Sequence, residues 1–275
     1  MFYSTEQISQ IDRQKFAYLL LKEDQHALYI YINRPETKNA FNEILINELA
    51  YALSYAHYNN NVWAIVLGAM GDVWCAGADM RTFQGQKDTT SQSTIPPPSG
   101  EIIIGDLFTM VHKPCIARVH APVFAGGFLF ICGCHFVVAS GNVFFSLPEV
   151  KRGIFPFQVM ASLLEILPSR NALDLCLLGK TIDAKEAHRL GIVTHLVSQE
   201  SNLDDTINIL LNKLREHSPS AVRLGLKAFD EMRGIKKEDQ HKFLFKMLME
   251  VVKTEDAREG ITAFKEKRAP VWKGK

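Results

Sequence analysis

One carboxylate and two turns of small residues are the features of this sequence whose chemistry stands out. Glu149 follows the largely apolar run 143–147 and has no second carboxylate beside it. Upstream, the segments 75–79 and 125–127 interrupt apolar runs with alanine and glycine, which leaves backbone N–H groups free to point into a pocket. Two such donors polarise a carbonyl, and one carboxylate moves a proton. Together they indicate a reaction that passes through an enolate.

Each of these features also has an ordinary structural interpretation. The segment 75–79 is by itself a tight turn, in which Asp79 is suited to capping the next segment. The segment 125–127 fits close packing of a helix on a sheet. Glu149 is followed by basic residues and fits a surface salt bridge. The presence of both turns before a single carboxylate favours the chemical interpretation.

The composition places the chain among globular proteins. It has 275 residues, of which 47% are hydrophobic and 22% charged, with a formal net charge of +1. Such a chain buries a full core and fits one large domain, with or without a helical extension. The small net charge gives no long-range field that attracts nucleic acid. No signal peptide and no membrane span is visible, so we expect a cytoplasmic protein with neither nucleic acid nor a membrane as its partner.

Several other kinds of site find no support in the sequence. The five cysteines lie mostly in apolar runs, as reduced core thiols do, and Cys132 and Cys134 have no second pair at zinc-finger spacing. We therefore predict no metal site. The segment 179–181 looks like the end of a phosphate-binding loop but lacks the upstream glycine. The chain has neither a dinucleotide-binding glycine motif nor a serine-hydrolase elbow.

Alternating strand and helix signals must position the two turns. The short apolar runs 27–32 and 62–67 are typical of strands covered on both faces. Apolar residues at helical spacing over 41–58 predict a helix between them. Further strands are expected at 115–119 and 136–139. The first two thirds of the chain is therefore predicted to be an α/β fold.

Two regions depart from this alternation. Residues 82–100 are polar and contain three consecutive prolines, which predicts a mobile surface loop that either covers a ligand or is a simple insertion. After residue 197 the strand signals stop and helical spacing takes over. The expected helices span about 203–217, 220–232, 238–252 and 256–268. The third carries a broad apolar stripe, which indicates packing on the body or on another subunit.

An ordered series of motifs resembles the crotonase superfamily, the enoyl-CoA hydratase/isomerase fold. The two turns and Leu147-Pro148-Glu149 belong to this series. The other matching motifs are Asn33-Arg34-Pro35, Lys38-Asn39-Ala40-Phe41-Asn42, Thr181-Ile182-Asp183-Ala184-Lys185-Glu186-Ala187, Leu190-Gly191-Ile192-Val193 and Ala263-Phe264-Lys265-Glu266-Lys267-Arg268. The resemblance covers nearly the whole chain.

The resemblance implies an α/β fold of the crotonase type, which is a spiral of β-β-α repeats with a C-terminal helical oligomerisation region. It implies a core at 1–197 that contains the acyl-CoA site and a helical trimerisation region at 198–275. A homotrimer or hexamer is the implied assembly. Coenzyme A takes part as a portion of the thioester substrate, and no cofactor is bound permanently.

The resemblance also implies roles for individual residues. The N–H groups of Ala78 and Gly126 match the oxyanion hole that binds the thioester carbonyl. Glu149 matches the catalytic glutamate that lies over the α and γ carbons of the substrate. An apolar pocket around Glu149 is expected to raise the pKa of its carboxyl.

A further set of positions matches the residues that bind coenzyme A. The positions in the groove for the nucleotide and pantetheine are Lys38, Ala40, Ala76, Asp79 and Met80. Phe264 and Lys267 match positions that reach the coenzyme A of a neighbouring subunit. Met80 and Phe264 equally fit ordinary packing, and Lys267 fits a solvated helix charge.

Two departures from the family pattern bear on the reaction. Hydratases of the family carry a second glutamate three residues after the second oxyanion-hole glycine, and this chain has Leu129 there. One base suits double-bond isomerisation, whereas hydration uses two carboxylates. His120 replaces the usual asparagine before the second turn, as either an auxiliary acid or base or a structural histidine. Isomerisation is favoured, with hydration, another lyase or decarboxylase reaction, and an acyl-CoA-binding subunit with little turnover as alternatives.

Overall fold

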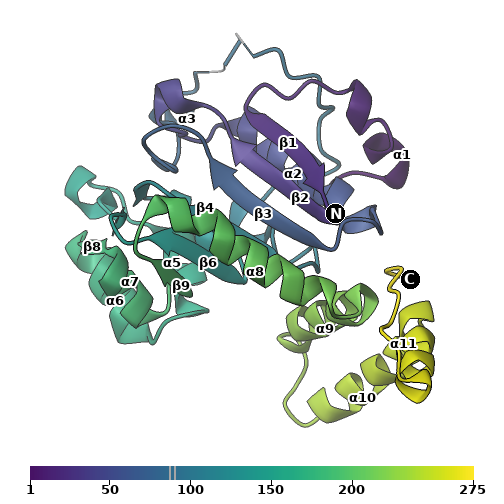
Figure 1. Cartoon of the computed structure of the whole chain (residues 1–275). Coiled ribbons are helices and arrows are strands. Elements are labelled where there is room, and N and C mark those ends of the chain that lie inside the picture. Colours follow the sequence, from purple (N-terminus) through teal and green to yellow (C-terminus); the bar gives the residue numbers. More distant parts are fainter. Residues whose placement is uncertain (87, 90) are drawn as a thin grey trace.

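The computed structural model describes residues 1–86, 88–89 and 91–275. Lys87 and Thr90, which belong to the expected loop at 82–100, lie outside the described residues. Within the described residues, the larger sheet has six strands in the order β1-β2-β3-β4-β6-β9 (Figure 1). These strands are β1 (Leu19–Asp24), β2 (Ala27–Ile32), β3 (Ala64–Ala69), β4 (Cys115–Val119), β6 (Phe136–Ser140) and β9 (His195–Val197). β1 runs antiparallel to β2, and the later pairs are parallel.

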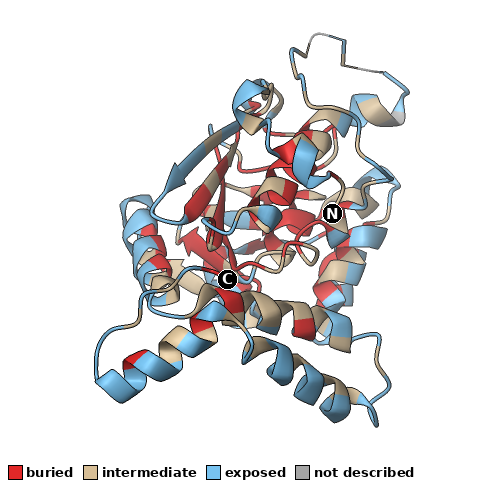
Figure 2. Cartoon of the chain, turned by 90° about the vertical axis from the view of Figure 1, so that its right-hand side faces the viewer, coloured by how far each residue is buried: buried red, intermediate tan, exposed pale blue. Residues whose placement is uncertain are grey.

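Both faces of this sheet are buried. Successive residues of a strand point to opposite faces. Leu28 of β2 belongs to the main core with α2 (Glu43–Tyr58), whereas Ala27 and Val66 pack with α8 (Leu203–Arg215) on the other face. Figure 2 shows the buried residues concentrated in the sheet and the helices beside it. The predicted strands at 27–32 and 62–67 are confirmed as strands covered on both faces, the second displaced by two residues.

A smaller sheet carries the segments that lead to the candidate site. Its strands are β5 (Val123–Phe124), β7 (Phe144–Ser146) and β8 (Thr181–Asp183). β5 runs parallel to β7, and β7 runs antiparallel to β8. Ala125 N extends the first pairing by donating to Ser146 O at 2.9 Å. The chain that enters the second turn therefore runs beside the chain that enters Glu149.

Two helices of the core begin after a residue whose side chain caps them. α2 follows Asn42, whose side chain accepts a hydrogen bond from Leu45 N at 3.0 Å and so caps the helix. α7 (Ala184–Leu190) is capped in the same way by Asp183, which accepts from Glu186 N at 2.8 Å. The other core helices are α1 (Thr5–Ile8), α3 (Met80–Phe83), α4 (Gly127–Cys132), α5 (Phe157–Leu164) and α6 (Ser169–Leu178).

The C-terminal third is helical, as the sequence predicts. α8 is followed by α9 (Pro219–Met232), α10 (Gln240–Val251) and α11 (Glu255–Glu266), each within a few residues of its expected bounds. Figure 1 shows α9, α10 and α11 extending away from the sheets. No described residue of α10 is buried, and Phe245 and Leu248 are 63% and 52% exposed. One chain alone therefore leaves the apolar stripe of this helix uncovered.

The second half of the expected loop at 82–100 is tied to the N-terminal segment. Thr94 N donates to Lys15 O at 3.0 Å, and Lys15 N donates to the Thr94 hydroxyl at 2.8 Å. Tyr3 donates to Pro96 O at 2.9 Å. These bonds hold residues 94–96 against the N-terminal segment. They fit an anchored insertion better than a loop that opens and closes over a ligand.

The cysteines are free thiols, and Cys75, Cys115 and Cys176 are buried, as expected of core residues. Burial raises the pKa of Cys75 to about 12. Among the described residues, no helix is both long enough and apolar enough to cross a membrane.

Candidate active site

The fold brings the two turns of small residues into contact. Phe124 N donates to Cys75 O at 2.9 Å, which pairs the strand before the second turn with the first turn. Gly77 has a φ of +92°, and a methyl group added there would lie 2.7 Å from the Ala125 side chain and 3.0 Å from Gly126 N. Glycine is required at position 77, because both its backbone angle and its neighbours exclude a side chain.

The N–H groups of Ala78 and Gly126 lie next to each other at this contact. A methyl group added to Gly126 would lie only 3.6 Å from Ala78 N. Neither N–H donates a hydrogen bond to any other described residue. Gly126 also caps the start of α4, where the first N–H groups of a helix have no partner within it. Two free donors this close are the kind of pair from which an oxyanion hole is built.

Asp79 follows the first donor and is fixed by a helix cap and by two arginines. Its side chain accepts from Arg81 N at 3.1 Å, so the predicted capping role is confirmed. Its carboxylate lies 2.8 Å from Arg34 and 2.7 Å from Arg81. Hydrogen bonds from Arg81 and Arg34 hold the pKa of Asp79 far below its usual range, although burial acts in the opposite direction. Asp79 is therefore a structural anion, and its predicted contact with coenzyme A stays a prediction.

Glu149 begins a short 3-10 turn, Glu149–Arg152, which follows β7. One of its carboxylate oxygens, Oε2, is buried and has no hydrogen-bond partner among the described residues. Burial raises the pKa of the Glu149 carboxyl, while a backbone hydrogen bond and the charge of Arg152 partly oppose this effect. A buried oxygen without a partner and a raised pKa suit proton transfer better than a surface salt bridge.

Leu129 lies at the position where the resemblance implies a second carboxylate for hydration. It is the third residue of α4, and its N–H donates to Gly126 O at 3.0 Å. Its side chain is 4% exposed and belongs to the main apolar core. The helix that begins at the second donor thus has an apolar residue at this position.

The predicted groove residues near the first turn are brought together. Ala76 N donates to Lys38 O at 3.0 Å, so the segment that contains Lys38 and Ala40 runs beside the first turn. Lys38 adopts a left-handed backbone conformation with φ of +55° and is exposed. Met80, at the start of α3, is 48% exposed. Both residues are therefore exposed, on segments that adjoin the first turn.

Phe264 and Lys267 are not brought to this site within one chain. Both belong to the end of α11, which Figure 1 shows at the opposite end of the molecule from α3. Phe264 is 86% exposed. A contact between these residues and a ligand at the first turn therefore requires a neighbouring subunit.

His120 contacts backbone rather than the candidate donors or Glu149. Its Nε2 lies 2.8 Å from Gly71 O, at the turn that follows β3. Its Nδ1 is buried and has no partner among the described residues. The bond to Gly71 fits the structural alternative for this histidine, and its auxiliary role stays a prediction.

Sequence reasoning missed the buried polar residues that hold the segment before the first turn. Arg34 is 3% exposed and Asn39 is fully buried. Arg34 Nη1 donates to Ala40 O at 2.7 Å, and Asn39 donates to the carbonyl oxygens of Met70 and Val73 at 2.7 Å. Both residues stand in recognisable motifs, but their burial depends on tertiary contacts that no sequence spacing displays.

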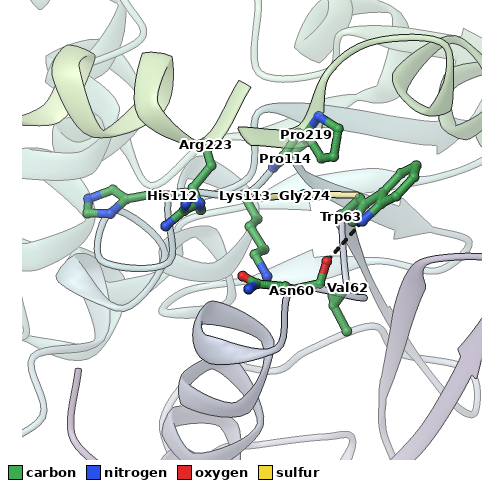
Figure 3. Close-up of a pocket in the computed structure, with 9 residues that line it drawn as sticks. All are labelled: Asn60, Val62, Trp63, His112, Lys113, Pro114, Pro219, Arg223 and Gly274. Carbon is green, nitrogen blue, oxygen red and sulfur yellow. Dashed lines mark hydrogen bonds between the residues drawn. The ribbon is translucent and has the colours of Figure 1, made fainter. Parts of the chain in front are cut away.

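Two cavities of the described residues differ in place and in character. One of about 290 Å³ borders Asp79 and is lined by charged side chains that include Arg34 and Arg81. The other, shown in Figure 3, measures about 10 Å³ and lies between the core and α9, with Lys113 and Arg223 in its lining. The smaller cavity has room for no more than about one water molecule. It is a packing contact rather than a ligand site.

Comparisons with known proteins agree with this architecture. A family model described as Enoyl-CoA hydratase/isomerase matches residues 22–275. The chain is 29% identical over 255 residues to a probable enoyl-CoA hydratase of Bacillus subtilis (strain 168), which covers 92% of this chain and 98% of that protein. It is 28% identical over 265 residues to the 2,3-dehydroadipyl-CoA hydratase of Escherichia coli (strain K12), which covers 94% of this chain and 99% of that protein.

Solved structures give the same result. An enoyl-CoA hydratase from Mycobacterium tuberculosis H37Rv matches with a TM-score of 0.82 at 30% sequence identity, over 94% of this chain and 100% of that chain. A probable enoyl-CoA hydratase/isomerase from Mycobacterium abscessus matches with a TM-score of 0.80 at 31% identity, over 94% of this chain and 99% of that chain. The predicted crotonase-type fold with C-terminal helices is confirmed by these matches.

Proposed function

We propose, from the premise that this chain belongs to the enoyl-CoA hydratase/isomerase family, that it moves the double bond of an enoyl-CoA thioester from C3 to C2. It is an acyl-CoA enzyme of that family. The choice of isomerisation within the family rests on the residues of the candidate site.

In the proposed reaction, the thioester oxygen accepts hydrogen bonds from Ala78 N–H and Gly126 N–H. The Glu149 carboxylate removes a proton from C2, and the electron pair enters a dienolate whose negative charge lies on that oxygen. The protonated Glu149 then returns the proton to C4, which leaves the double bond between C2 and C3. Each oxyanion donor contributes a factor of roughly 10²–10³ in rate. The raised pKa of Glu149 suits a group that must both accept and donate the proton.

The observation that carries this choice is the combination of Glu149, whose buried Oε2 has no hydrogen-bond partner among the described residues, with the buried Leu129. Hydration requires a group that holds and deprotonates water at C3 while a proton is delivered at C2. Leucine offers neither an acceptor nor a base. Isomerisation needs only one group that carries one proton over a short distance.

Product analysis tests this proposal. The purified protein is incubated separately with a trans-3-enoyl-CoA and a trans-2-enoyl-CoA, and the products are identified by mass spectrometry and chromatography. Conversion of the 3-enoyl substrate without a change in mass, and no addition of water to the 2-enoyl substrate, is the expected result. Efficient hydration of the 2-enoyl substrate contradicts the choice of isomerisation.

Hydration is the second candidate, and the names of the relatives favour it. The B. subtilis and E. coli proteins are both named as hydratases. If this chain hydrates as they are named to do, another group must activate water in place of a glutamate at position 129. Failure to convert either substrate, together with tight binding of a CoA thioester, would instead indicate an acyl-CoA-binding subunit.

We propose the groove beside the first turn as the place where coenzyme A binds. Lys38, Ala40, Ala76, Asp79 and Met80 form one side of it. Coenzyme A takes part only as a portion of the substrate, and the proposal requires no other cofactor and no metal.

We propose further that residues 1–197 form the catalytic core and that 198–275 serve assembly into a trimer or hexamer. The exposed apolar residues of α10 support this division, since they have no cover within one chain. In such an assembly, Phe264 and Lys267 reach the coenzyme A of a neighbouring subunit, which agrees with their distance from the site of their own chain.

A further inference from the structure

The first donor of the proposed oxyanion hole is held by one neighbouring segment. Phe41 N donates to Gly77 O at 2.9 Å, and Asp79 N donates to Phe41 O at 2.8 Å. Ala78 lies between these two bonds and is paired with Phe41 as an isolated bridge. The direction of the Ala78 N–H group therefore depends on how the segment around Phe41 is fixed to the segment around Asp79.

Arg34 joins these two segments from inside the protein. Its Nη1 donates to Ala40 O at 2.7 Å and to Asp79 Oδ2 at 2.8 Å. Ala40 precedes Phe41, and Asp79 follows Ala78, so one nitrogen atom spans the pairing that holds the donor. The Arg34 side chain is 3% exposed, and water therefore competes little for these bonds.

The guanidinium group has further contacts, while its Nε is buried and has no hydrogen-bond partner among the described residues. It lies over the Tyr18 ring, 4.8 Å from the ring centre, and its Nη2 is 3.5 Å from a carboxylate oxygen of Asp88. Asn39 accepts a hydrogen bond from the backbone N–H of Arg34 at 2.8 Å. A planar guanidinium with several fixed contacts can set the relative position of two segments, which a flexible ammonium group cannot do as well.

The charge of Arg34 is also placed where the reaction needs it. Asp79 follows Ala78 directly, and its negative charge alone would oppose the charge that develops on the thioester oxygen. Arg81 compensates part of this charge, but its side chain is 54% exposed and its effect is screened by water. Arg34 provides the compensation inside the protein.

We infer that Arg34 is a positioning residue of this site, which aligns the Ala78 N–H group by bridging Ala40 and Asp79 and compensates the Asp79 charge. It touches no reacting atom and acts through Ala78. The inference rests on the proposed function, because it requires a thioester carbonyl between Ala78 and Gly126. Substitution of Arg34 is therefore expected to reduce the polarisation of the thioester carbonyl and kcat, but not the affinity for the thioester.

The test measures carbonyl polarisation separately from turnover. Butanoyl-CoA is saturated and cannot isomerise, and the infrared band of its thioester carbonyl shifts to lower frequency when the oxygen accepts hydrogen bonds. The wild-type protein is expected to shift this band. Arg34→Met is expected to lose most of the shift and to lower kcat for a 3-enoyl-CoA by about tenfold to hundredfold, since the donor is misaligned rather than removed. The Kd of butanoyl-CoA should change by less than about threefold.

Three further variants separate positioning from general destabilisation. Arg34→Lys keeps the charge without the rigid bridge, and a partial loss of the band shift is expected. Arg34→Met combined with Asp79→Asn removes the unpaired buried carboxylate, so it provides a foldable variant if the single change prevents folding. Its band shift should remain reduced, because Ala40 is still unbridged. Arg118→Met removes an arginine that pairs with Asp204 at 2.7 Å between β4 and α8, and it should leave the band unchanged.

Each outcome decides one point. A folded Arg34→Met protein with the full band shift and full kcat overturns the inference and leaves the proposed function intact. Restoration of the full shift in the double variant overturns the bridging role, and an equal loss in Arg118→Met overturns any specific role. Absence of a band shift in the wild-type protein overturns the proposed oxyanion hole itself, so this failure is distinct from the others.

Discussion

At the scale of single residues, the proposed role of Glu149 rests on the environment of its carboxyl. Its buried oxygen has no partner among the described residues, and burial raises the pKa of its carboxyl. We expect Glu149→Gln, which keeps the size of the side chain and removes the base, to lower kcat by roughly 10²–10⁴. Binding of butanoyl-CoA, measured by calorimetry, should be retained. Turnover close to that of the wild-type protein would show that another group carries the proton.

The same raised pKa predicts how activity depends on pH. Proton removal requires the ionised carboxylate, so kcat/KM should rise with pH through the pKa of Glu149 in the free enzyme. Burial raises this pKa above its ordinary value of 4.5. On acidification, kcat/KM should therefore begin to fall at a higher pH than it would in an enzyme whose catalytic glutamate is exposed. A pH profile of kcat/KM checks this expectation. An inflection at or below 4.5 would contradict the described environment of the carboxyl.

The sequence could predict those site residues whose type interrupts the surrounding pattern. Ala78 and Gly126 stand in turns of small residues that interrupt apolar runs, and the structure brings these two turns together. Arg34 gave no such signal on its own, because its importance lies in partners from three distant segments. Burial of a charged residue is a tertiary property, and a local pattern does not contain it.

At the scale of secondary-structure elements, the start of α4 has a residue without a side chain at its N-cap, Gly126. Gly126 has a φ of −58°, which alanine also adopts, so an added methyl group acts through contact and not through backbone strain. That methyl would lie 2.7 Å from the Phe41 ring and 3.6 Å from Ala78 N. We expect Gly126→Ala to fold and to lower kcat by about 10².

Gly225 provides the matched control for this change. It lies within α9, and a methyl group added there would meet no described atom within 4 Å. Gly225→Ala should leave kcat unchanged and stabilise the protein by about 0.5–1 kcal/mol in urea unfolding, because alanine favours a helix. An equal loss of kcat in both variants would remove the link between position 126 and the oxyanion hole.

Lys113 supports the end of α2 and predicts a pH dependence of stability. Its Nζ donates to Ala56 O and to Asn59 O, the latter at 2.7 Å, and burial lowers the pKa of Lys113 from 10.5 to about 7. The unfolded chain therefore binds this proton more tightly than the folded protein. The wild-type protein should lose stability relative to Lys113→Met as the pH falls from about 10 to 7, by up to about 1.4 kcal/mol per pH unit.

Urea unfolding at several pH values measures this difference directly. Met leaves two carbonyl oxygens without a donor, so Lys113→Met should be less stable than the wild-type protein at pH 10 by about 1–3 kcal/mol. Lys227→Met, which removes a lysine whose side chain is 44% exposed, should show the pH dependence of the wild-type protein. A constant difference between wild type and Lys113→Met would contradict the lowered pKa.

The length of each element explains how well it could be predicted. β2 and β4 are buried runs of five or six residues, and the predicted bounds agree with those of the structure. β5 and β8 have only two or three residues, which is too short for a periodic pattern. They form because the neighbouring strand is already in place. The smaller sheet beside the candidate site was consequently not visible in the sequence.

At the scale of the whole molecule, α10 is the part that a single chain leaves incomplete. We expect the protein to assemble in solution, with light scattering giving a mass of three or six chains. Phe245→Glu together with Leu248→Glu should shift this mass toward one chain, because both residues are exposed and apolar in the monomer. Lys246→Glu, in the same helix, is the control and should assemble normally. A wild-type mass of one chain would remove the proposed role of 198–275.

The adjacency of Ala78 N–H and Gly126 N–H has a consequence for how this site can be changed. Both donors belong to peptide bonds, so among the natural amino acids only proline deletes either of them, and proline also constrains the backbone. Replacing one of these amides by an ester through protein semisynthesis would remove a single donor and leave every side chain intact. In the proposed site, the two donors are set by the path of the backbone, so the surrounding side chains can change without removing either donor.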